Sequence, residues 1–358
     1  MGKAFLIRPC SWKILAIVGA TFAPAIANAQ CLISGASARL SNFCILEQMS
    51  QNLIDYRLAL LIDTRLKSEG YSRGLGLPNS QAAPTTSTKA FVQPILSYSD
   101  NINGGNSPEP LVLGSLTFDG DEALYRKEGI IAGLGAGLNG RYILDEGQYI
   151  NYGVTASYAH SPEFGLGITT TGVNVSSINH IQNWWYFDAH ITTSRVRKDI
   201  TDNTTSTISL VTSKVYSSGG DSYSEASFGI SRYFADSYTQ NQFTLGYDTI
   251  HSNGMFSSVD VMFGEALEGQ LTTRFSSRAR VSMQLVNKPL SLTARYSTAD
   301  GGMMFGFERN ENTYEISATY PIWGNLKATV GYRVTDSTID YFDVDTPSFG
   351  VEFTSIQF

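Results

Sequence analysis

Strict alternation of apolar and polar residues near the end of the chain limits its fold more than any other feature. In the segment 313–334, apolar side chains recur at every second position, with hydroxyl or charged side chains between them. The apolar set is Tyr314, Ile316, Ala318, Tyr320, Ile322, Leu326, Ala328, Val330, Tyr332 and Val334. Successive side chains of a β-strand point to opposite faces, so each strand here has one apolar and one polar face. The apolar face points inward in a soluble sandwich and outward to lipid in a membrane barrel.

Segments of this kind follow one another from residue 89 to residue 358. Turns rich in Gly, Asp and Asn separate them, as at 145–147 and 218–221. We predict about 16 strands. The alternative is 14 strands, because the apolar–polar alternation changes parity within 165–195 and one pair of strands can merge. The expected strands are 90–100, 110–119, 128–143, 147–160, 165–176, 180–195, 204–216, 222–236, 239–250, 255–264, 270–286, 289–298, 302–309, 313–322, 324–336 and 346–358.

Two features favour lipid over a protein core as the environment of the apolar faces. Tyrosines and tryptophans gather near strand ends, for example at 184–186 and 320–323. Full charges occur in the middle of the polar faces. Aromatic girdles at the membrane interfaces explain the first feature, and a wet lumen explains the second. The sequence therefore predicts an all-β fold, a transmembrane antiparallel up-and-down β-barrel of 14–16 strands at 89–358.

The first 29 residues are typical of a secretory signal peptide. Lys3, Arg8 and Lys13 precede an apolar run that is too short to span a bilayer, and an Ala-Asn-Ala site ends at Ala29. We expect cleavage before Gln30. The formal net charge then changes from −7 to −10, which argues against nucleic acid as a partner.

The last strand and its final residue carry a resemblance to a known class. Alternating strands, aromatic strand ends and a terminal Phe358 resemble Gram-negative outer-membrane β-barrel proteins. The resemblance implies residence in the cell outer membrane and recognition of Phe358 by the barrel-assembly machinery. It also implies contact with outer-membrane lipid and, through local basic patches, lipopolysaccharide. Phe353 and Ile356 have opposite parity, so we expect a bulge or register change near Thr354.

The region before the barrel contains one expected helix. Within a periplasmic segment at 30–66, apolar residues in 38–66 recur three and four positions apart, at Leu46, Met49, Leu53, Tyr56 and Leu60. This stripe predicts docking under the barrel, plugging of the barrel, or self-association. Cys31 and Cys44 are the cysteines of the mature chain, and an oxidising periplasm favours a disulfide between them. Residues 67–88 are rich in Gly, Ser, Pro and Thr and predict a linker.

Charged residues on the polar faces form the candidate functional site. The expected lumen set is Arg274, Arg278, Arg280, Arg295, Glu308, Glu315, Lys327 and Arg333. Fixed charges in a pore select small solutes by sign, which predicts a passive, porin-like transport function. The alternative is that these charges pair with one another and hold a narrow or plugged lumen. Short loops on both sides predict no long constriction loop.

An enzymatic function has weak support in the sequence. His190 lies on a polar face two residues from Asp188, and a barrel hydrolase would need a nucleophile beside such a pair. A hydrogen-bonded pair in the lumen is the simpler interpretation. We expect no enzyme activity, no metal site and no cofactor, since their motifs are absent.

A second resemblance involves the barrel region 90–358. The segment PILSYSDNINGGN at 94–106, the Gly-rich strand 128–138 and the closing PIWGNLKATVGYRVTDSTIDYFD resemble the barrel domain of the surface lipoprotein assembly modifier family. The resemblance implies a barrel that helps move lipoproteins to the cell surface. In that family a periplasmic domain of helical repeats precedes the barrel, whereas this chain has one expected helix there.

Overall fold

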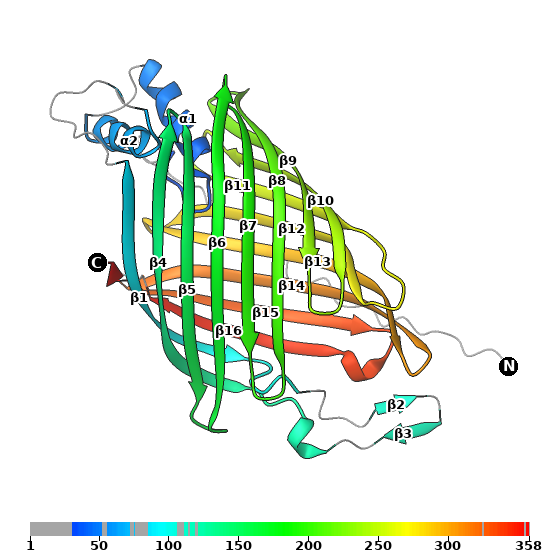
Figure 1. Ribbon diagram of the computed structural model, residues 1–358. Coiled ribbons are helices and arrows are strands. Elements are labelled where there is room, and N and C mark those ends of the chain that lie inside the picture. The colour runs from blue at the N-terminus through cyan, green and yellow to red at the C-terminus, as the bar shows by residue number, and fades with distance from the viewer. Residues whose placement is uncertain are drawn as a thin grey trace.

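The computed structural model describes residues 31–51, 56–71, 75, 85–105, 111–113, 115–118, 121–323, 326–353 and 356–357. The expected signal peptide and Phe358 lie outside these residues. Within them, 14 antiparallel strands form one closed β-barrel, each hydrogen-bonded to its neighbours in chain order (Figure 1). The barrel strands are β1 (Thr86–Ser99), β4 (Gly129–Asp145), β5 (Gln148–Ser161), β6 (Leu166–Gln182), β7 (Trp185–Arg197), β8 (Asp202–Gly219), β9 (Ser222–Phe234), β10 (Thr239–Ile250), β11 (Phe256–Gly264), β12 (Thr272–Leu285), β13 (Lys288–Met304), β14 (Phe307–Trp323), β15 (Leu326–Ser337) and β16 (Val344–Phe353), which β17 (Ile356–Gln357) continues.

The lower of the two expected strand numbers is confirmed, for reasons other than those expected. Within the segment 110–119, the described residues form a separate small hairpin, β2 (Leu111–Leu113) and β3 (Leu116–Phe118), and these described residues pair with no barrel strand. The segment 302–309 is the tip of the β13–β14 hairpin. The stretch 165–195 remains two full strands, β6 and β7.

The barrel closes between its first strand and its last. Ile95 of β1 pairs with Glu352, and Val92 of β1 pairs with Ile356. Three positions along β1 thus match four along the last strand, so one extra residue lies between Glu352 and Ile356. The register change that the sequence predicts here is confirmed, and Thr354 itself lies outside the described residues.

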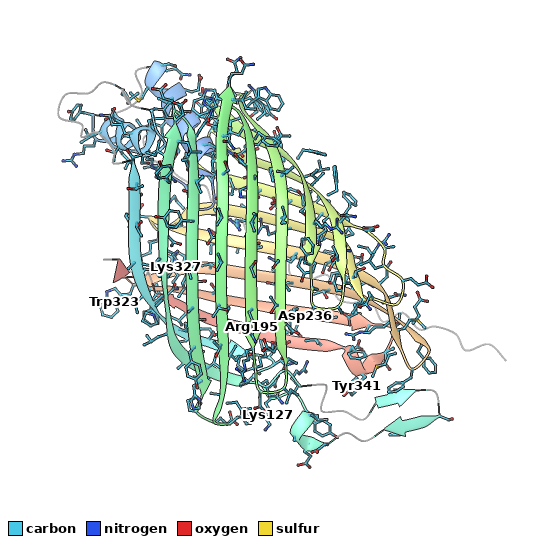
Figure 2. The ribbon with its side chains drawn as sticks, in the orientation of Figure 1. Lys127, Arg195, Asp236, Trp323, Lys327 and Tyr341 are labelled. Carbon is cyan, nitrogen blue, oxygen red and sulfur yellow. A yellow bond between two sulfur atoms is a disulfide. The ribbon has the colours of Figure 1, made fainter. Side chains whose placement is uncertain are left out.

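Apolar side chains cover the outside of the barrel and are exposed. Leu134, Ile191, Ile316 and Val330 each expose more than half of their surface, although a sandwich would bury them in a core. Side chains are drawn in Figure 2, where Trp323 projects from the wall at the end of β14 and is 84% exposed. We call this surface the outer belt. The soluble-sandwich alternative is therefore excluded.

Two helices, not one, precede the barrel among the residues that the structure describes. Helix α1 spans Ala38–Ser50 and is capped at its N-terminus by Ser37, whose Oγ accepts a hydrogen bond from the Leu40 amide. Helix α2 spans Tyr56–Ser68 and so runs past the expected boundary at residue 66. The break between the helices resets the helical phase, so the predicted stripe is wrong in its second half: Tyr56 is 57% exposed, whereas α2 buries Leu58, Ile62 and Leu66.

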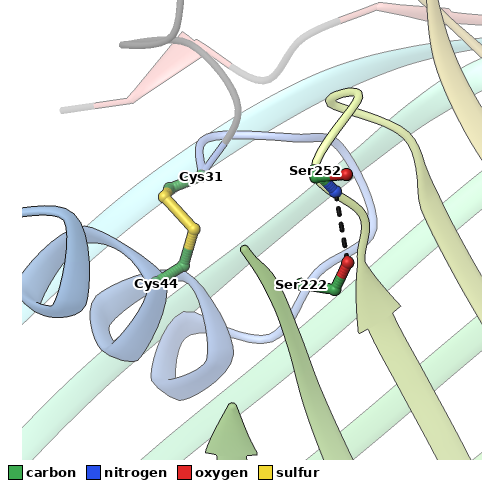
Figure 3. Close-up of a disulfide and its surroundings, with 4 residues drawn as sticks. All are labelled: Cys31, Cys44, Ser222 and Ser252. Atoms are coloured by element: carbon green, nitrogen blue, oxygen red, sulfur yellow. Dashed lines mark hydrogen bonds between the residues drawn. A yellow bond between two sulfur atoms is a disulfide. The ribbon is translucent and has the colours of Figure 1, made fainter. Parts of the chain in front are cut away.

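The described residues within 31–71 form a compact unit, here called the plug, at one end of the barrel (Figure 1). The predicted Cys31–Cys44 disulfide is present and ties the coil before α1 to the helix (Figure 3). The apolar side chains of the plug pack on inward-facing wall residues: Tyr186, Val215, Tyr223, Ile250 and Phe256. This contact is the main apolar core among the described residues. No helix in the described ranges is long and apolar enough to cross a membrane.

The two ends of the barrel differ in their connections. At the end that holds the plug, called the helix end, the described turns are short, as at 146–147 and 220–221. The opposite end, called the loop end, carries the connection 100–128 between β1 and β4. The expectation of short loops on both sides is therefore wrong. The connection 100–128 joins two neighbouring strands, so its length does not change the apolar–polar alternation from which the strands were predicted.

Candidate functional site

Five charged residues lie side by side on the inner faces of neighbouring strands. Asp260 on β11 pairs in register with Arg278 on β12, which pairs with Arg295 on β13. Arg295 in turn pairs with Glu315 on β14, and Glu315 pairs with Arg333 on β15. Residues directly opposite on antiparallel strands have their Cβ atoms about 5 Å apart. We call these five residues the charge ladder.

Each arginine of the charge ladder has a carboxylate partner. Arg278 Nη2 lies 2.7 Å from Asp260 Oδ2, and Arg295 Nη1 lies 3.6 Å from Glu315 Oε2. The arginine on β15 pairs with Asp100, which belongs to the long connection at the loop end. These side chains remain 31–47% exposed, so they face water inside the barrel. The sequence left two expectations for these charges: a charge-selective pore wall, or charges that pair with one another. The distances match pairing, and the paired side chains still line open space in the lumen.

The other predicted lumen residues lie away from the charge ladder. Arg274 lies at the β-bulge near the loop end of β12, and Arg280 reaches the plug at Gly35. Lys327 is the second residue of β15, at the helix end. Glu308 is exposed at the tip of the β13–β14 hairpin, beyond a register shift, and contributes nothing to the ladder.

The inner faces of β4–β6 carry no charge in the middle of the barrel. Their side chains are small or neutral: Gly133, Gly135, Gly137, Thr155, Ser157, Thr170, Gly172 and Asn174. The charged wall, β11–β15, therefore faces a neutral wall. In the middle of the barrel, the charges of these two walls therefore lie on only one side of the lumen.

A buried ion-pair network fixes the plug inside the barrel. Arg39 of α1 contacts two wall carboxylates, with Nη1 at 2.5 Å from Asp188 Oδ2 and Nε at 2.6 Å from Glu225 Oε1. The two carboxylate side chains are only 2% and 5% exposed. The expected partner of Asp188 was His190, but the carboxylate instead binds the plug. Arg39 is thus the ion-pair partner of Asp188, on the same inner face as His190.

The end of the plug docks through polar contacts on β4–β6. Glu69 is buried and accepts hydrogen bonds from Asn42 Nδ2 at 3.1 and 3.3 Å, and its carbonyl accepts from the Gly147 amide. Burial raises the pKa of Glu69. Tyr71 Oη lies 2.6 Å from His180 Nδ1, and burial raises the pKa of Tyr71 to about 12. The start of the predicted linker is therefore a docked part of the plug.

At the loop end, residues 100–105 cross the mouth of the barrel; we call them the crossing segment. Ile102 is fully buried against the inward-facing Ile131 and Ala159 of β4 and β5. Asn103 is also fully buried, and its carbonyl accepts a hydrogen bond from the Ile200 amide between β7 and β8. This part of the chain thus covers the mouth on the side of the neutral wall.

The side chain of Asn103 holds the crossing segment in place. Its Nδ2 donates to the Tyr125 carbonyl at 2.7 Å, and its Oδ1 accepts from the Lys127 and Gly105 amides at 3.0 and 3.1 Å. Lys198 Nζ donates to the carbonyl of Asn101 at 2.6 Å. The lumen at the loop end is therefore narrowed by backbone that strand periodicity did not reveal.

The space that remains lies along the charged wall. A cavity of about 490 Å³ is lined by Asp260, Arg278 and Arg295, among others. A second cavity of about 600 Å³ lies at the helix end between the plug and the β12–β13 turn, with Gln284 and Asn287 on its wall. The plug and the crossing segment thus leave room on the side where the charges are.

Exposed apolar residues outside and water-facing charges inside can coexist in one closed sheet only where lipid surrounds the sheet. The chain is a transmembrane β-barrel protein. No family model matches its sequence, and no curated protein matches it.

Solved barrels show low similarity to this one. OccK2 (OpdF) of Pseudomonas aeruginosa has a TM-score of 0.41 at 9% identity, covering 75% of this chain and 97% of its own. OccAB2 of Acinetobacter baumannii has a TM-score of 0.38 at 8% identity, covering 76% and 98%. OprD of Pseudomonas aeruginosa has a TM-score of 0.39 at 9% identity, covering 76% and 95%.

Proposed function

We propose that this barrel is a passive pore for small polar solutes, with its helix end in the periplasm and its loop end outside the cell. Solutes enter beside the crossing segment, pass the charge ladder and leave between the plug and the β12–β13 turn. Short turns on the periplasmic side and longer loops outside are typical of such barrels. We assign the protein no enzymatic activity.

One observation carries this proposal. The crossing segment packs on β4 and β5 of the neutral wall through Ile102, and the plug is held at the helix end by Asp188 of β7 and Glu225 of β9. The 490 Å³ cavity contains ladder residues of β11–β13 in its wall, and the 600 Å³ cavity lies between the plug and the β12–β13 turn. A barrel whose charges served only to close the lumen would not keep its free space along them. The lipoprotein-assembly alternative lacks such support, since the described residues before β1 form two short helices and no helical repeat.

The pairing of the ladder charges sets the expected selectivity. Asp260 balances Arg278, and Glu315 balances Arg295, so the wall has little net charge but a strong local field. We expect weak preference between small anions and cations. Uncharged and dipolar solutes gain from such a wall because fixed charges of both signs can bind their polar groups.

Reversal potentials in planar bilayers under a KCl gradient test this proposal. Asp260→Asn leaves Arg278 unpaired and is expected to shift permeability toward anions, whereas Arg278→Gln leaves Asp260 unpaired and shifts it toward cations. The double variant is expected to return near the wild-type value. Asp336→Asn, which removes a charge near the loop end of β15, is the control and should change nothing. Bilayers that stay silent with correctly folded protein would refute the pore.

A further inference from the structure

Two arginines at the helix end line a cavity without a carboxylate partner among the described residues. Arg65 belongs to α2 of the plug and Arg141 belongs to β4, and both line the 600 Å³ cavity between the plug and the β12–β13 turn. Neither guanidinium group forms an ion pair with a described residue, whereas Arg39 and the arginines of the charge ladder all do. The two side chains therefore have a role that the charge ladder does not explain.

The guanidinium group of Arg141 is held in one orientation by its neighbours. Its Nε donates to Asn151 Oδ1 at 2.9 Å, and its Nη1 donates to the Ser68 carbonyl at 3.0 Å. The group also lies over Tyr149, with its Cζ 4.2 Å from the centre of the ring. Among the described residues nothing accepts a hydrogen bond from Nη2, so its N–H groups are left for a ligand.

Arg65 brings a second guanidinium group to the same cavity from the plug. It lies one helical turn before Ser68 on α2, and the Ser68 hydroxyl donates to the Arg65 carbonyl at 2.7 Å. The same hydroxyl accepts a hydrogen bond from Arg141 Nη1 at 3.3 Å. Figure 1 shows α2 at the helix end of β4, where these contacts join the plug to the wall.

The cavity carries a positive charge because one carboxyl group is set against two guanidinium groups. Glu69 is the acidic residue among the described residues that line it. Burial raises the pKa of Glu69, although the positive charges of Arg141 and Arg65 act in the opposite direction. Both carboxyl oxygens accept from Asn42 Nδ2, and neither arginine forms an ion pair with Glu69. The net charge of the lining is therefore positive whether or not Glu69 is ionised.

The groups around the two arginines suit a tetrahedral anion. Ser34 and Ser41 of the plug also line the cavity, and Ser68 contacts both arginines. A carboxylate presents two oxygens in one plane, which a single arginine satisfies. A phosphate group presents three oxygens in different directions, so it can accept hydrogen bonds from two arginines on different elements and from a hydroxyl. Arg141 lies on the inner face of β4, so the cavity is open to soluble phosphate compounds.

We propose that Arg65, Arg141 and the neighbouring serines bind the phosphate group of free phosphate or of a small phosphate monoester. Because Arg65 belongs to the plug and Arg141 to the wall, the bound phosphate bridges the two and stabilises the docked plug. A ligand that binds only one form of a protein favours that form by mass action. Binding and plug stabilisation do not depend on conduction, and only an effect on the current rests on the proposed pore function.

Isothermal titration calorimetry of the detergent-purified protein tests the site, with inorganic phosphate and glucose 6-phosphate as the probes. Wild type should bind like the control Arg57→Gln, which removes an exposed charge from the same helix. Arg65→Gln and Arg141→Gln should each bind at least about tenfold more weakly, because each removes charge-assisted hydrogen bonds. Acetate should also bind wild type at least about tenfold more weakly than phosphate does. The tighter of the two phosphate probes identifies the source of the bound group.

Hydrogen exchange of the α1 amides measures the stabilisation of the plug. Saturating phosphate should slow it in wild type and in Arg57→Gln but not in Arg65→Gln. Without phosphate, Arg65→Gln should exchange like wild type, since the Arg65 side chain has no hydrogen bond to the described wall residues.

Three results would contradict these expectations. Equal phosphate binding by Arg65→Gln and Arg57→Gln would overturn the site, as would acetate binding as tightly as phosphate. Phosphate binding with unchanged α1 exchange in wild type would overturn the bridge between plug and wall. Phosphate binding together with electrically silent bilayers would refute the pore and leave the phosphate site standing.

Discussion

At the scale of single residues, Arg39 decides whether the lumen is narrowed at the helix end. It is the cation between two wall carboxylates that are almost completely removed from water. A buried ion pair contributes little net stability while intact, but loss of one partner leaves an uncompensated charge. The plug is therefore held mainly by the free-energy cost of leaving the buried carboxylates of Asp188 and Glu225 without a cation, and less by the attraction of the intact ion pairs.

Replacing Arg39 should release the plug. Arg39→Gln is expected to weaken plug docking by about 3 kcal/mol or more, since two buried carboxylates lose their cation. Hydrogen exchange of the α1 amides would then accelerate about 100-fold, and single-channel conductance would rise. Arg57→Gln, which removes an exposed charge from α2, should leave both unchanged. Unaltered α1 exchange in Arg39→Gln would show that apolar packing alone holds the plug.

The Glu69 carboxyl makes docking depend on pH. Burial raises the pKa of Glu69. At a pH between the ordinary and the raised pKa, the carboxyl is therefore protonated in the docked form and ionised in the undocked form. Docking is strongest below the ordinary pKa of Glu and weakens as pH rises through the raised value. Glu69→Gln should remove this dependence and dock more tightly than wild type at pH 7. The α1 exchange rate between pH 4 and pH 7 measures it, and parallel profiles for the two proteins would contradict the assignment.

At the scale of elements, the crossing segment lacks the regular pairing that holds a strand. One buried side chain, Asn103, satisfies the amides of Gly105 and Lys127 and the carbonyl of Tyr125. A loop of this kind stays in the mouth because an unsatisfied buried N–H group costs about 1–3 kcal/mol. Hydrogen bonds within the connection between β1 and β4 thus fix the shape of the segment, and the hydrogen bonds from Ile200 and Lys198 hold it in the mouth.

Removing this side chain should open the loop end. Asn103→Ala leaves two amides without their acceptor, a cost of about 3 kcal/mol, and the crossing segment is expected to leave the mouth. Liposome swelling should then admit larger neutral sugars than wild type does. Glu122→Ala, an exposed change in the same connection, is the matched control. An unchanged size limit in Asn103→Ala would place the narrowest point elsewhere.

At the scale of the whole molecule, the sequence predicts the repeated strands but misses the contacts that register and loop closure create. Period-two alternation predicted the barrel, its outward faces and most of the lumen charges, because every strand obeys the same rule. The partners Asp260 and Asp100 were missed, since register and loop closure bring them to Arg278 and Arg333. Asp260 could have been found by aligning β11 with β12 across their connection. Nothing in the local sequence of Asp100 indicates a contact with β15.

The two narrow points lie in series along one lumen, and this predicts how their effects combine. Electrical resistances in series add, so opening one narrow point leaves the other to limit the current. The Arg39→Gln/Asn103→Ala double variant should therefore gain more single-channel conductance than the two single variants gain together. Recordings at one salt concentration from the four proteins measure this. Gains that simply add would mean that the plug and the crossing segment border separate pathways, since parallel conductances are additive.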